Sequence, residues 1–170
     1  MFLKTTLHKN YTLITLSKKP ANAFCIDFLK KFINIMNNID TNKAIIITGE
    51  GSIFSAGLDL FYISKINKTD FKHLVDTFEK LLLTIISHPA PTYTILNGHA
   101  IAGGFILLSC TDYCFTQDTN YKIGLNENIL NFSLPPIASA ILHLKYNPLL
   151  HLLHHLFPLF WIFYRSIQLI

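Results

Sequence analysis

The sequence predicts an α/β layered domain, because short segments rich in β-branched and aromatic residues alternate with segments of helical periodicity. Its length of 170 residues suits one domain with a real core and is too short to expect two. Hydrophobic residues make up 51% of the chain and charged residues only 14%, a composition that excludes a disordered protein. We therefore expect one globular unit with unusually apolar surfaces.

The first expected elements are two strands separated by a helix. Residues 11–17, YTLITLS, have the Tyr, Ile and Thr content of a strand, and residues 44–48, AIIIT, form a short apolar run typical of a strand buried on both faces. Asp27 is expected to cap the N-terminus of the helix between them. Four side chains recur at the spacing of one helix face: Leu29, Phe32, Ile33 and Met36.

A second helix is predicted after Thr69, closed by His88-Pro89. Its inward face carries apolar side chains at helical spacing: Phe71, Leu74, Val75, Phe78, Leu81, Leu82 and Ile85. A strand over 92–96, a buried helix over 103–110 and a strand over 113–116 are predicted to follow. Asp112 is expected to order the turn before the last of these strands.

Charge and cysteine usage exclude several classes of protein. The chain has 14 Lys plus Arg against 10 Asp plus Glu, a net charge of +4, and its lysines are scattered. This scatter forms no continuous basic stripe of the kind that binds nucleic acid. Three cysteines, Cys25, Cys110 and Cys114, form no CxxC pair and are odd in number, which argues against a disulfide framework and favours a reducing compartment.

The N-terminal residues do not indicate a targeting segment. The first 20 residues, MFLKTTLHKNYTLITLSKKP, lack the apolar region of a secretory signal. They also lack the arginines of a mitochondrial transit peptide, so import into that organelle is not indicated by these residues.

Two glycine-bearing loops follow two of the predicted strands. GEGSIFSAGLDL, residues 49–60, comes directly after AIIIT, and NGHAIAGGF, residues 97–105, comes directly after TYTIL. Loops beyond the carboxyl ends of parallel strands form ligand crevices, and glycine allows another molecule to approach the backbone closely. The alternative is that Gly57, Gly103 and Gly104 only make turns.

The runs AIIITGEGSIFSAGLDL and PTYTILNGHAIAGGFILLSCTDY together resemble the crotonase superfamily of enoyl-CoA hydratases and isomerases. Within that family, FSAGLDL and YKIGLNE are most similar to the mitochondrial-type Δ3,Δ2-enoyl-CoA isomerase. The resemblance covers roughly residues 10 to 148. It implies a spiral of ββα units, an acyl-CoA substrate, the mitochondrial matrix and, where the family's C-terminal helices are present, a homotrimer. It implies no separate cofactor, since coenzyme A is part of the substrate.

The resemblance also assigns roles in removing a proton beside a thioester carbonyl. The oxyanion of the resulting enolate needs preorganised donors, and the matching positions are the backbone N–H groups of Ala56 and Gly103. Hydratases of the family use two glutamates, but this chain has Ile106 at the first position and keeps Glu127 at the second. A double-bond shift needs one base, so a single carboxylate favours isomerase. An apolar setting would raise the pKa of Glu127 toward the working range.

Further positions match the substrate-binding segments of the family: Ala21, Asn22, Ala56, Gly57, Leu58, Asp59, Leu60, Gly104 and Asn126. Each has a plainer alternative. KPANAF, residues 19–24, matches the segment beside the CoA adenine but is equally an ordinary loop, and Asp59 is expected to cap a helix rather than to catalyse. Glu127 is a surface residue in the plain alternative.

The C-terminal residues depart from the family, which divides the chain into a crotonase-like core, 1–148, and an unmatched hydrophobic tail, 149–170. Residues 149–164 carry no formal charge, yet the run falls short of the ~20 residues that span a bilayer. A buried or interfacial helix is therefore favoured over membrane contact, and a truncated or misread gene end, which would leave out the family's usual C-terminal helical region, is favoured over both. Three histidines have helical spacing but no acid nearby, so no metal site is predicted: His151, His154 and His155. A second hypothesis for function follows: a catalytically inactive remnant that binds acyl-CoA, a partner or a membrane.

Overall fold

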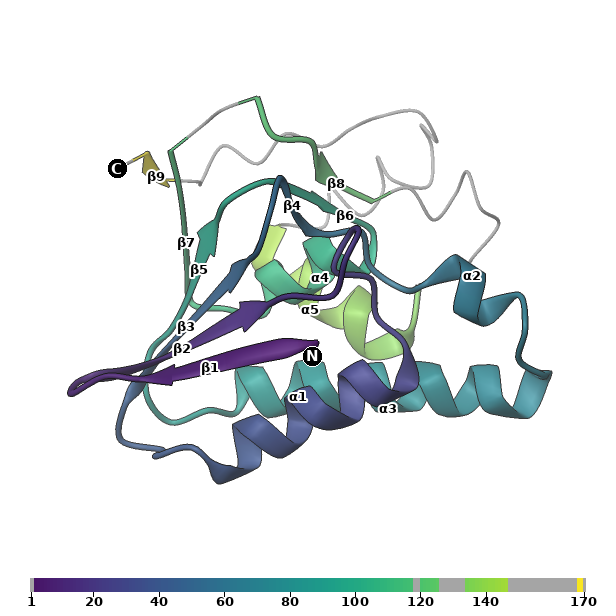
Figure 1. Ribbon diagram of the computed structural model, residues 1–170, viewed down its shortest axis with the longest axis horizontal. Coiled ribbons are helices and arrows are strands. Elements are labelled where there is room, and N and C mark those ends of the chain that lie inside the picture. Colours follow the sequence, from purple (N-terminus) through teal and green to yellow (C-terminus); the bar gives the residue numbers. More distant parts are fainter. Residues whose placement is uncertain (1, 118–119, 126–133, 147–167, 170) are drawn as a thin grey trace.

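The computed structural model describes residues 2–117, 120–125, 134–146 and 168–169 (Figure 1). In chain order the elements are β1 Leu3–Leu7, β2 Tyr11–Leu16, α1 Ile26–Asn38, β3 Ala44–Gly49, β4 Ile53–Ser55, α2 Leu60–Ile63, α3 Lys68–Ile86, β5 Thr92–Leu96, β6 His99–Ile101, α4 Gly103–Ser109, β7 Tyr113–Thr116, β8 Ile123–Gly124, α5 Pro136–Tyr146 and β9 Gln168–Leu169.

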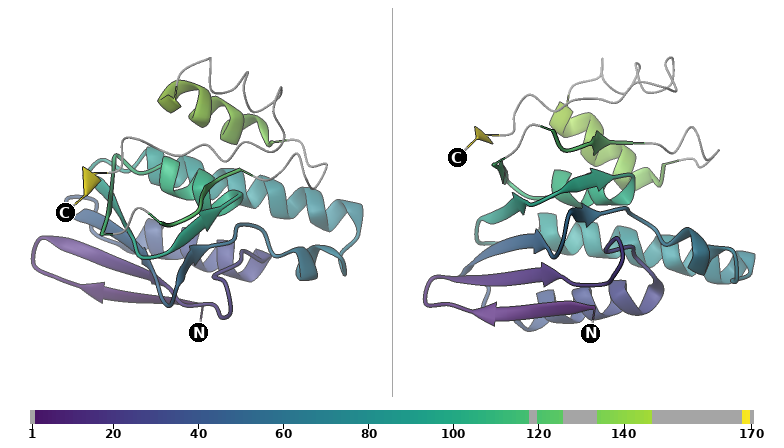
Figure 2. Two further views of the ribbon diagram at one scale, coloured as in Figure 1. Left: turned by 90° about the horizontal axis from the view of Figure 1, so that it is seen from above. Right: turned by 45° about the horizontal axis from the view of Figure 1, so that its top comes forward.

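The strands form two sheets whose order reveals a repeating unit. The larger sheet has the order β1-β2-β3-β5-β7-β9 and the smaller sheet the order β4-β6-β8. All neighbours are parallel except β1 and β2, which are antiparallel. From β3 onward the chain passes from a strand of the larger sheet to a strand of the smaller sheet and then on to a helix, whereas β1 and β2 both lie in the larger sheet before α1. This ββα turn repeats, and Figure 2 shows the turns stacked in chain order from β1 to α5.

Phenylalanines fill the core between the sheets and the helices. The largest fully buried side chains include Phe24, Phe28, Phe32, Phe54 and Phe78. The ring of Phe24 lies 5.2 Å from that of Phe28 and 5.7 Å from that of Phe78, measured between centroids. The first of these rings belongs to a loop and the others to α1 and α3, so the aromatic cluster joins the N-terminal loop to both helices. Burial of this aromatic surface stabilises the packing of the loop on both helices.

The main elements predicted from the sequence are confirmed, with three local differences. Helix α1 begins after Cys25, which makes no side-chain capping bond, and Asp27 lies inside the first turn, so the predicted Asp27 cap is wrong. Strand β3 buries Ile45 and Ile47 fully but Ile46 only partly, so it is not buried on both faces. On α3, the buried face also includes Thr77, which was not predicted to point inward. Its hydroxyl donates to the carbonyl of His73 and so has a partner inside the protein.

Helix α5 is fastened to the rest of the domain by polar contacts at both of its ends. The carboxylate of Glu79 on α3 accepts the Ile137 N–H at 2.8 Å. The Lys145 ammonium donates to the carbonyl of Ser109, at 2.9 Å, and to that of Thr111. Both carbonyls lie at the C-terminal end of α4. Desolvation of this ammonium lowers the pKa of Lys145, and burial raises the pKa of the neighbouring Cys110 thiol to about 12. These contacts satisfy helix-end groups that would otherwise lack partners.

None of the described helices is both long and apolar enough to cross a membrane. Most of the hydrophobic tail predicted at 149–170 lies outside the described residues. Its end forms β9, which pairs with Phe115 and Thr116 at the edge of the larger sheet.

Candidate active site

The two glycine loops meet at the ends of β4 and β6, as the sequence led us to expect. These strands are parallel neighbours, with Ile53 opposite His99 and Ser55 opposite Ala100. A methyl group on Gly104 would lie 2.2 Å from the carbonyl oxygen of Ser55, so α4 packs directly on β4 with no room for a side chain. Gly104 therefore serves the packing of the two loops.

The backbone nitrogens of Leu58 and Gly103 lie close together where the two loops meet. Gly103 opens α4, and a methyl group built on it would lie 3.5 Å from the Leu58 nitrogen. Within the described part of the chain, neither the Leu58 N–H nor the Gly103 N–H makes a hydrogen bond. The first N–H groups of a helix lack intrahelical partners, and the helix dipole adds positive potential there. A pair of free donors thus lies between the loops.

Gly57 keeps this pair of donors accessible. It has φ of +80°, and a methyl group on it would lie only 2.5 Å from the Gly103 nitrogen. Any side chain at this position would both strain the backbone and press against the N–H group. On the other loop, Ala102 has φ of +52°, an uncommon conformation for alanine that directs the chain from β6 into α4.

The Ala56 N–H, predicted as one of the two donors, is engaged elsewhere. It donates to the carbonyl oxygen of Ala21 at 3.0 Å, in a bond that ties the 19–24 segment to the loop after β4. The structure therefore gives Ala56 a structural role. Leu58, two residues on, has the free N–H.

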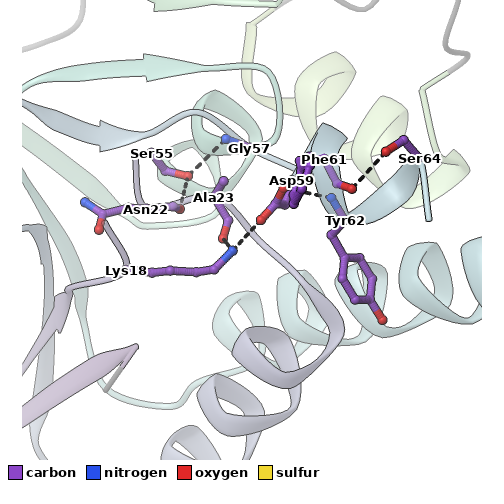
Figure 3. Close-up of polar contacts among 9 residues, drawn as sticks. All are labelled: Lys18, Asn22, Ala23, Ser55, Gly57, Asp59, Phe61, Tyr62 and Ser64. Carbon is purple, nitrogen blue, oxygen red and sulfur yellow. Dashed lines mark hydrogen bonds and ion pairs between the residues drawn. The ribbon is translucent and has the colours of Figure 1, made fainter. Parts of the chain in front are cut away.

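Asn22 is a buried residue whose hydrogen bonds hold β4 and the loop after it. It is 2% exposed with φ of +51°, and its side-chain amide donates to the carbonyls of Ile53 at 2.8 Å and Phe54 at 3.1 Å. The backbone carbonyl of Asn22 accepts a hydrogen bond from the Ser55 hydroxyl at 2.9 Å. The Ser55 hydroxyl oxygen in turn accepts the Gly57 N–H at 3.1 Å (Figure 3). Asn22 thus holds the loop that carries Gly57 and Leu58. Because its side-chain amide is already hydrogen-bonded to β4, its effect on the site is to position this loop.

Asp59 and Lys18 form a second tie between the same segments (Figure 3). Their side chains lie 2.5 Å apart and are 22% and 15% exposed, and Lys18 also donates to the Ala23 carbonyl. Asp59 accepts the Tyr62 N–H at 3.0 Å and so caps α2, which confirms the capping prediction. Burial alone would raise the pKa of Asp59, but the Lys18 bond and charge and the α2 N–H groups lower it below its ordinary value.

The surface around the junction has both a hollow and an exposed apolar patch. The hollow, of about 310 Å³, lies beside the 19–24 segment and is lined by Ser17, Lys19, Pro20, Asn22, Glu50, Gly51 and Ser52. On α2, Leu60 is 48% exposed and Phe61 is 72% exposed. The Lys65 ammonium lies 3.6 Å from the centre of the Phe61 ring. The hollow thus carries one basic and one acidic side chain, Lys19 and Glu50, whereas the exposed patch on α2 is apolar.

Two predicted site residues, Glu127 and Asn126, lie outside the described residues. The strand before them is described: β8 lies beside β6, and the Ala102 N–H donates to the Gly124 carbonyl at 2.9 Å. Ile106, at the position where the hydratases of the resembling family have a glutamate, is buried within α4. Helix α4 therefore has no carboxylate at this position.

Among the described residues, no group of three His, Cys, Asp or Glu side chains could hold a metal ion. The histidines at 151, 154 and 155 lie in the part of the chain that the structure does not describe. Asp112 does order its turn, as predicted, because its carboxylate accepts both the N–H and the hydroxyl of Thr92.

Sequence comparison identifies the family of this chain. Residues 7–142 match the family described as enoyl-CoA hydratase/isomerase, and the chain belongs to that family. It is 28% identical over 142 residues to the peroxisomal enoyl-CoA delta isomerase 2 of Arabidopsis thaliana, and 31% identical over 121 residues to the mitochondrial enoyl-CoA delta isomerase 1 of Rattus norvegicus. These alignments cover 78% and 68% of this chain.

Among solved structures, human mitochondrial delta3-delta2-enoyl-CoA isomerase superposes with a TM-score of 0.77 at 21% identity, over 84% of this chain and 58% of that chain. This likeness establishes the crotonase fold. The chain spans 59% of the length of the Arabidopsis relative and 42% of that of the rat relative.

Proposed function

We propose that this chain isomerises 3-enoyl-CoA to trans-2-enoyl-CoA, a step of fatty-acid β-oxidation. The observation that carries the proposal is the free pair of N–H groups, on Leu58 and Gly103, where the two glycine loops meet. Such a pair suits the oxygen of a thioester carbonyl, which gains negative charge when a proton leaves the adjacent carbon. Leu58 replaces Ala56 in this role.

The reaction begins when the thioester oxygen accepts hydrogen bonds from the two N–H groups. A base then breaks the C2–H bond, and the electron pair is delocalised over the carbonyl as a dienolate. When C4 is protonated, the double bond has moved from C3–C4 to C2–C3 and the base is regenerated. The N–H pair stabilises the dienolate more than the substrate, which is the condition for catalysis.

Glu127 is the proposed base. It follows Gly124 by three residues, a span of at most ~10 Å of chain. Gly124 is itself hydrogen-bonded to Ala102, next to the donor Gly103. One carboxylate suffices for the shift, because it can take the proton from C2 and return it to C4. The apolar Ile106 on α4 supports isomerisation over hydration, which needs a second acid–base group.

The substrate is proposed to lie across both surfaces beside the junction. The CoA moiety would follow the 19–24 segment with its hollow, where Lys19 offers a positive charge, and the acyl chain would lie toward Leu60 and Phe61. Ala21 and Asn22 contribute through the backbone of this segment. The mitochondrial matrix and a homotrimer belong to the same proposal. The rat relative's name supports that compartment, whereas the Arabidopsis relative is named peroxisomal.

The test is an assay of the purified chain with a 3-enoyl-CoA, following the appearance of the conjugated 2-enoyl thioester. We expect isomerisation, and no more than a trace of hydration when a 2-enoyl-CoA is supplied. Faster hydration than isomerisation would contradict the proposal.

The alternative is that the chain binds acyl-CoA without catalysing its isomerisation. Measurable acyl-CoA affinity without isomerase activity would establish that alternative.

A further inference from the structure

The side chain of His99, the first residue of β6, makes a hydrogen bond to the main chain just before β8. Its Nδ1 accepts the backbone N–H of Lys122 at 2.9 Å. The next residue, Ala100, donates its own N–H to the Lys122 carbonyl, also at 2.9 Å. Both polar groups of the Lys122 main chain are therefore held by adjacent residues of β6. The Tyr121 ring stands edge-on to the imidazole, with centroids 6.1 Å apart, and covers it from the same segment.

This bond matters because the strand that it secures is very short. Strand β8 has two residues, Ile123 and Gly124, and few ladder bonds are available to so short a strand. A hydrogen bond just before β8 fixes where the strand begins, as the Ala102–Gly124 bond fixes its end. The start and the end of β8 are thereby both tied to β6.

We infer that His99 is a positioning residue, which acts by holding the strand that leads to the proposed base. The inference rests on the proposed function. A misplacement of about 1 Å can cost a reacting group roughly 10²-fold in rate, so a strand that leads to such a group needs a defined register. The imidazole must keep Nδ1 unprotonated to accept the Lys122 N–H, and this requirement distinguishes a hydrogen-bonding role from simple packing.

The contact is partly open to solvent, which limits the size of the expected effect. Water can take the place of the imidazole as acceptor for the Lys122 N–H. Removing the acceptor should therefore loosen the strand without unfolding it. The substrate-binding surfaces on the 19–24 segment and α2 make no use of this bond, so acyl-CoA affinity should be unchanged.

The experiment compares His99→Leu, which removes the acceptor, with His99→Asn, whose side-chain oxygen can occupy the Nδ1 position. In the isomerase assay we expect His99→Leu to lower kcat about three- to ten-fold, with KM and acyl-CoA affinity within about two-fold of the parent. His99→Asn should recover most of the lost kcat. Amide hydrogen exchange should show faster exchange of the Lys122 N–H in His99→Leu alone, which is a readout independent of activity.

Three results would overturn the inference: a His99→Leu variant with parental kcat, equal losses in the two variants, or a loss confined to KM. If the parent itself does not isomerise 3-enoyl-CoA, the proposed function fails and this inference with it. An active parent with an unchanged His99→Leu variant contradicts the inference on His99 alone.

Discussion

The oxyanion half of the candidate site is made of main chain packed against main chain, whereas the base half depends on a strand of two residues. Gly57, Gly103 and Gly104 lie so close to the opposite loop that added methyl groups would meet backbone atoms within about 3 Å. Strand β8 is held by a few bonds to β6, one of them from a side chain. The first half is therefore sensitive to atoms that are added, and the second to groups that are removed. The two halves can be damaged separately.

The largest expected effect comes from the base half. Glu127→Gln keeps the size and shape of the side chain but removes the group that carries the proton. We expect kcat for isomerisation to fall by about 10²–10⁴, while acyl-CoA affinity, measured by calorimetry, stays at the parental value. A Glu127→Gln variant that turns over at the parental rate would contradict the assignment of the base.

The next effect comes from the oxyanion half. Gly57→Ala puts a methyl group 2.5 Å from the Gly103 nitrogen, so the donor pair should be displaced and kcat should fall by about 10²–10³.

Gly51→Ala is the matched control for this substitution, because Gly51 also has a positive φ, +92°, but nothing lies within 4 Å of an added methyl group. It carries the backbone strain without the steric contact. Because Gly51 lines the hollow proposed for CoA, the comparison is made in kcat at saturating substrate, which should be close to that of the parent. Equal losses in the two variants would assign the Gly57 effect to strain alone.

A smaller effect, on stability, is expected where α5 is fastened to α4. Lys145→Met removes the bonds to the Ser109 and Thr111 carbonyls and should lower the free energy of unfolding by about 1 kcal/mol, measured by denaturant titration. Lys72→Met is the control, because Lys72 makes an ion pair with Asp76 in which both side chains are more than half exposed. Exposed pairs of this kind contribute little. A control as destabilising as Lys145→Met would argue against a specific role for the α5 contact.

The smallest expected effect concerns pH and the Lys18–Asp59 pair. The pKa of Asp59 is lower in the folded protein than its ordinary value, so the carboxylate stabilises the fold above that ordinary value. This contribution should be lost as the pH falls from the ordinary Asp pKa through the lowered one. Asp59→Asn should therefore be less stable than the parent at neutral pH, and the difference should shrink in acid.

Glu50→Gln provides the comparison for Asp59→Asn. The Lys4–Glu50 pair is about half exposed, and its effect on stability should be smaller than that of the Lys18–Asp59 pair. If Glu50→Gln destabilises the protein as much as Asp59→Asn does at every pH, the burial argument for the Asp59 pair is wrong.

Much of the fold was accessible from local sequence patterns. The apolar run before Gly49, the TYTIL strand and the buried helix from Gly103 all follow from periodicity and glycine placement. The meeting of the two loops was implied by the family resemblance, which assigned one donor to each loop. The choice between Ala56 and Leu58 could not be made in this way. It depends on the Ala21–Ala56 bond, which joins residues far apart in the sequence and engages one N–H while leaving the other free.

Other features depended equally on long-range contacts. The roles of Asn22 and Lys145 arise from carbonyls that lie more than thirty residues away along the chain. The capping role of Asp59 is local and was predicted, whereas its ion pair with Lys18 spans the two segments and was not. Short strands such as β4, β6 and β8 were also missed, because two or three residues carry no periodicity.

The most direct test of the central claim is the infrared spectrum of a saturated acyl-CoA, isotopically labelled at the thioester carbonyl and bound to the chain. If the N–H groups of Leu58 and Gly103 donate hydrogen bonds to this oxygen, the carbonyl stretch should move to lower frequency than in water. The shift should persist in Glu127→Gln and Gly51→Ala and disappear in Gly57→Ala. A bound thioester with its aqueous frequency, or a Gly57→Ala variant that keeps the full shift, would contradict the claim that these two N–H groups form the oxyanion site.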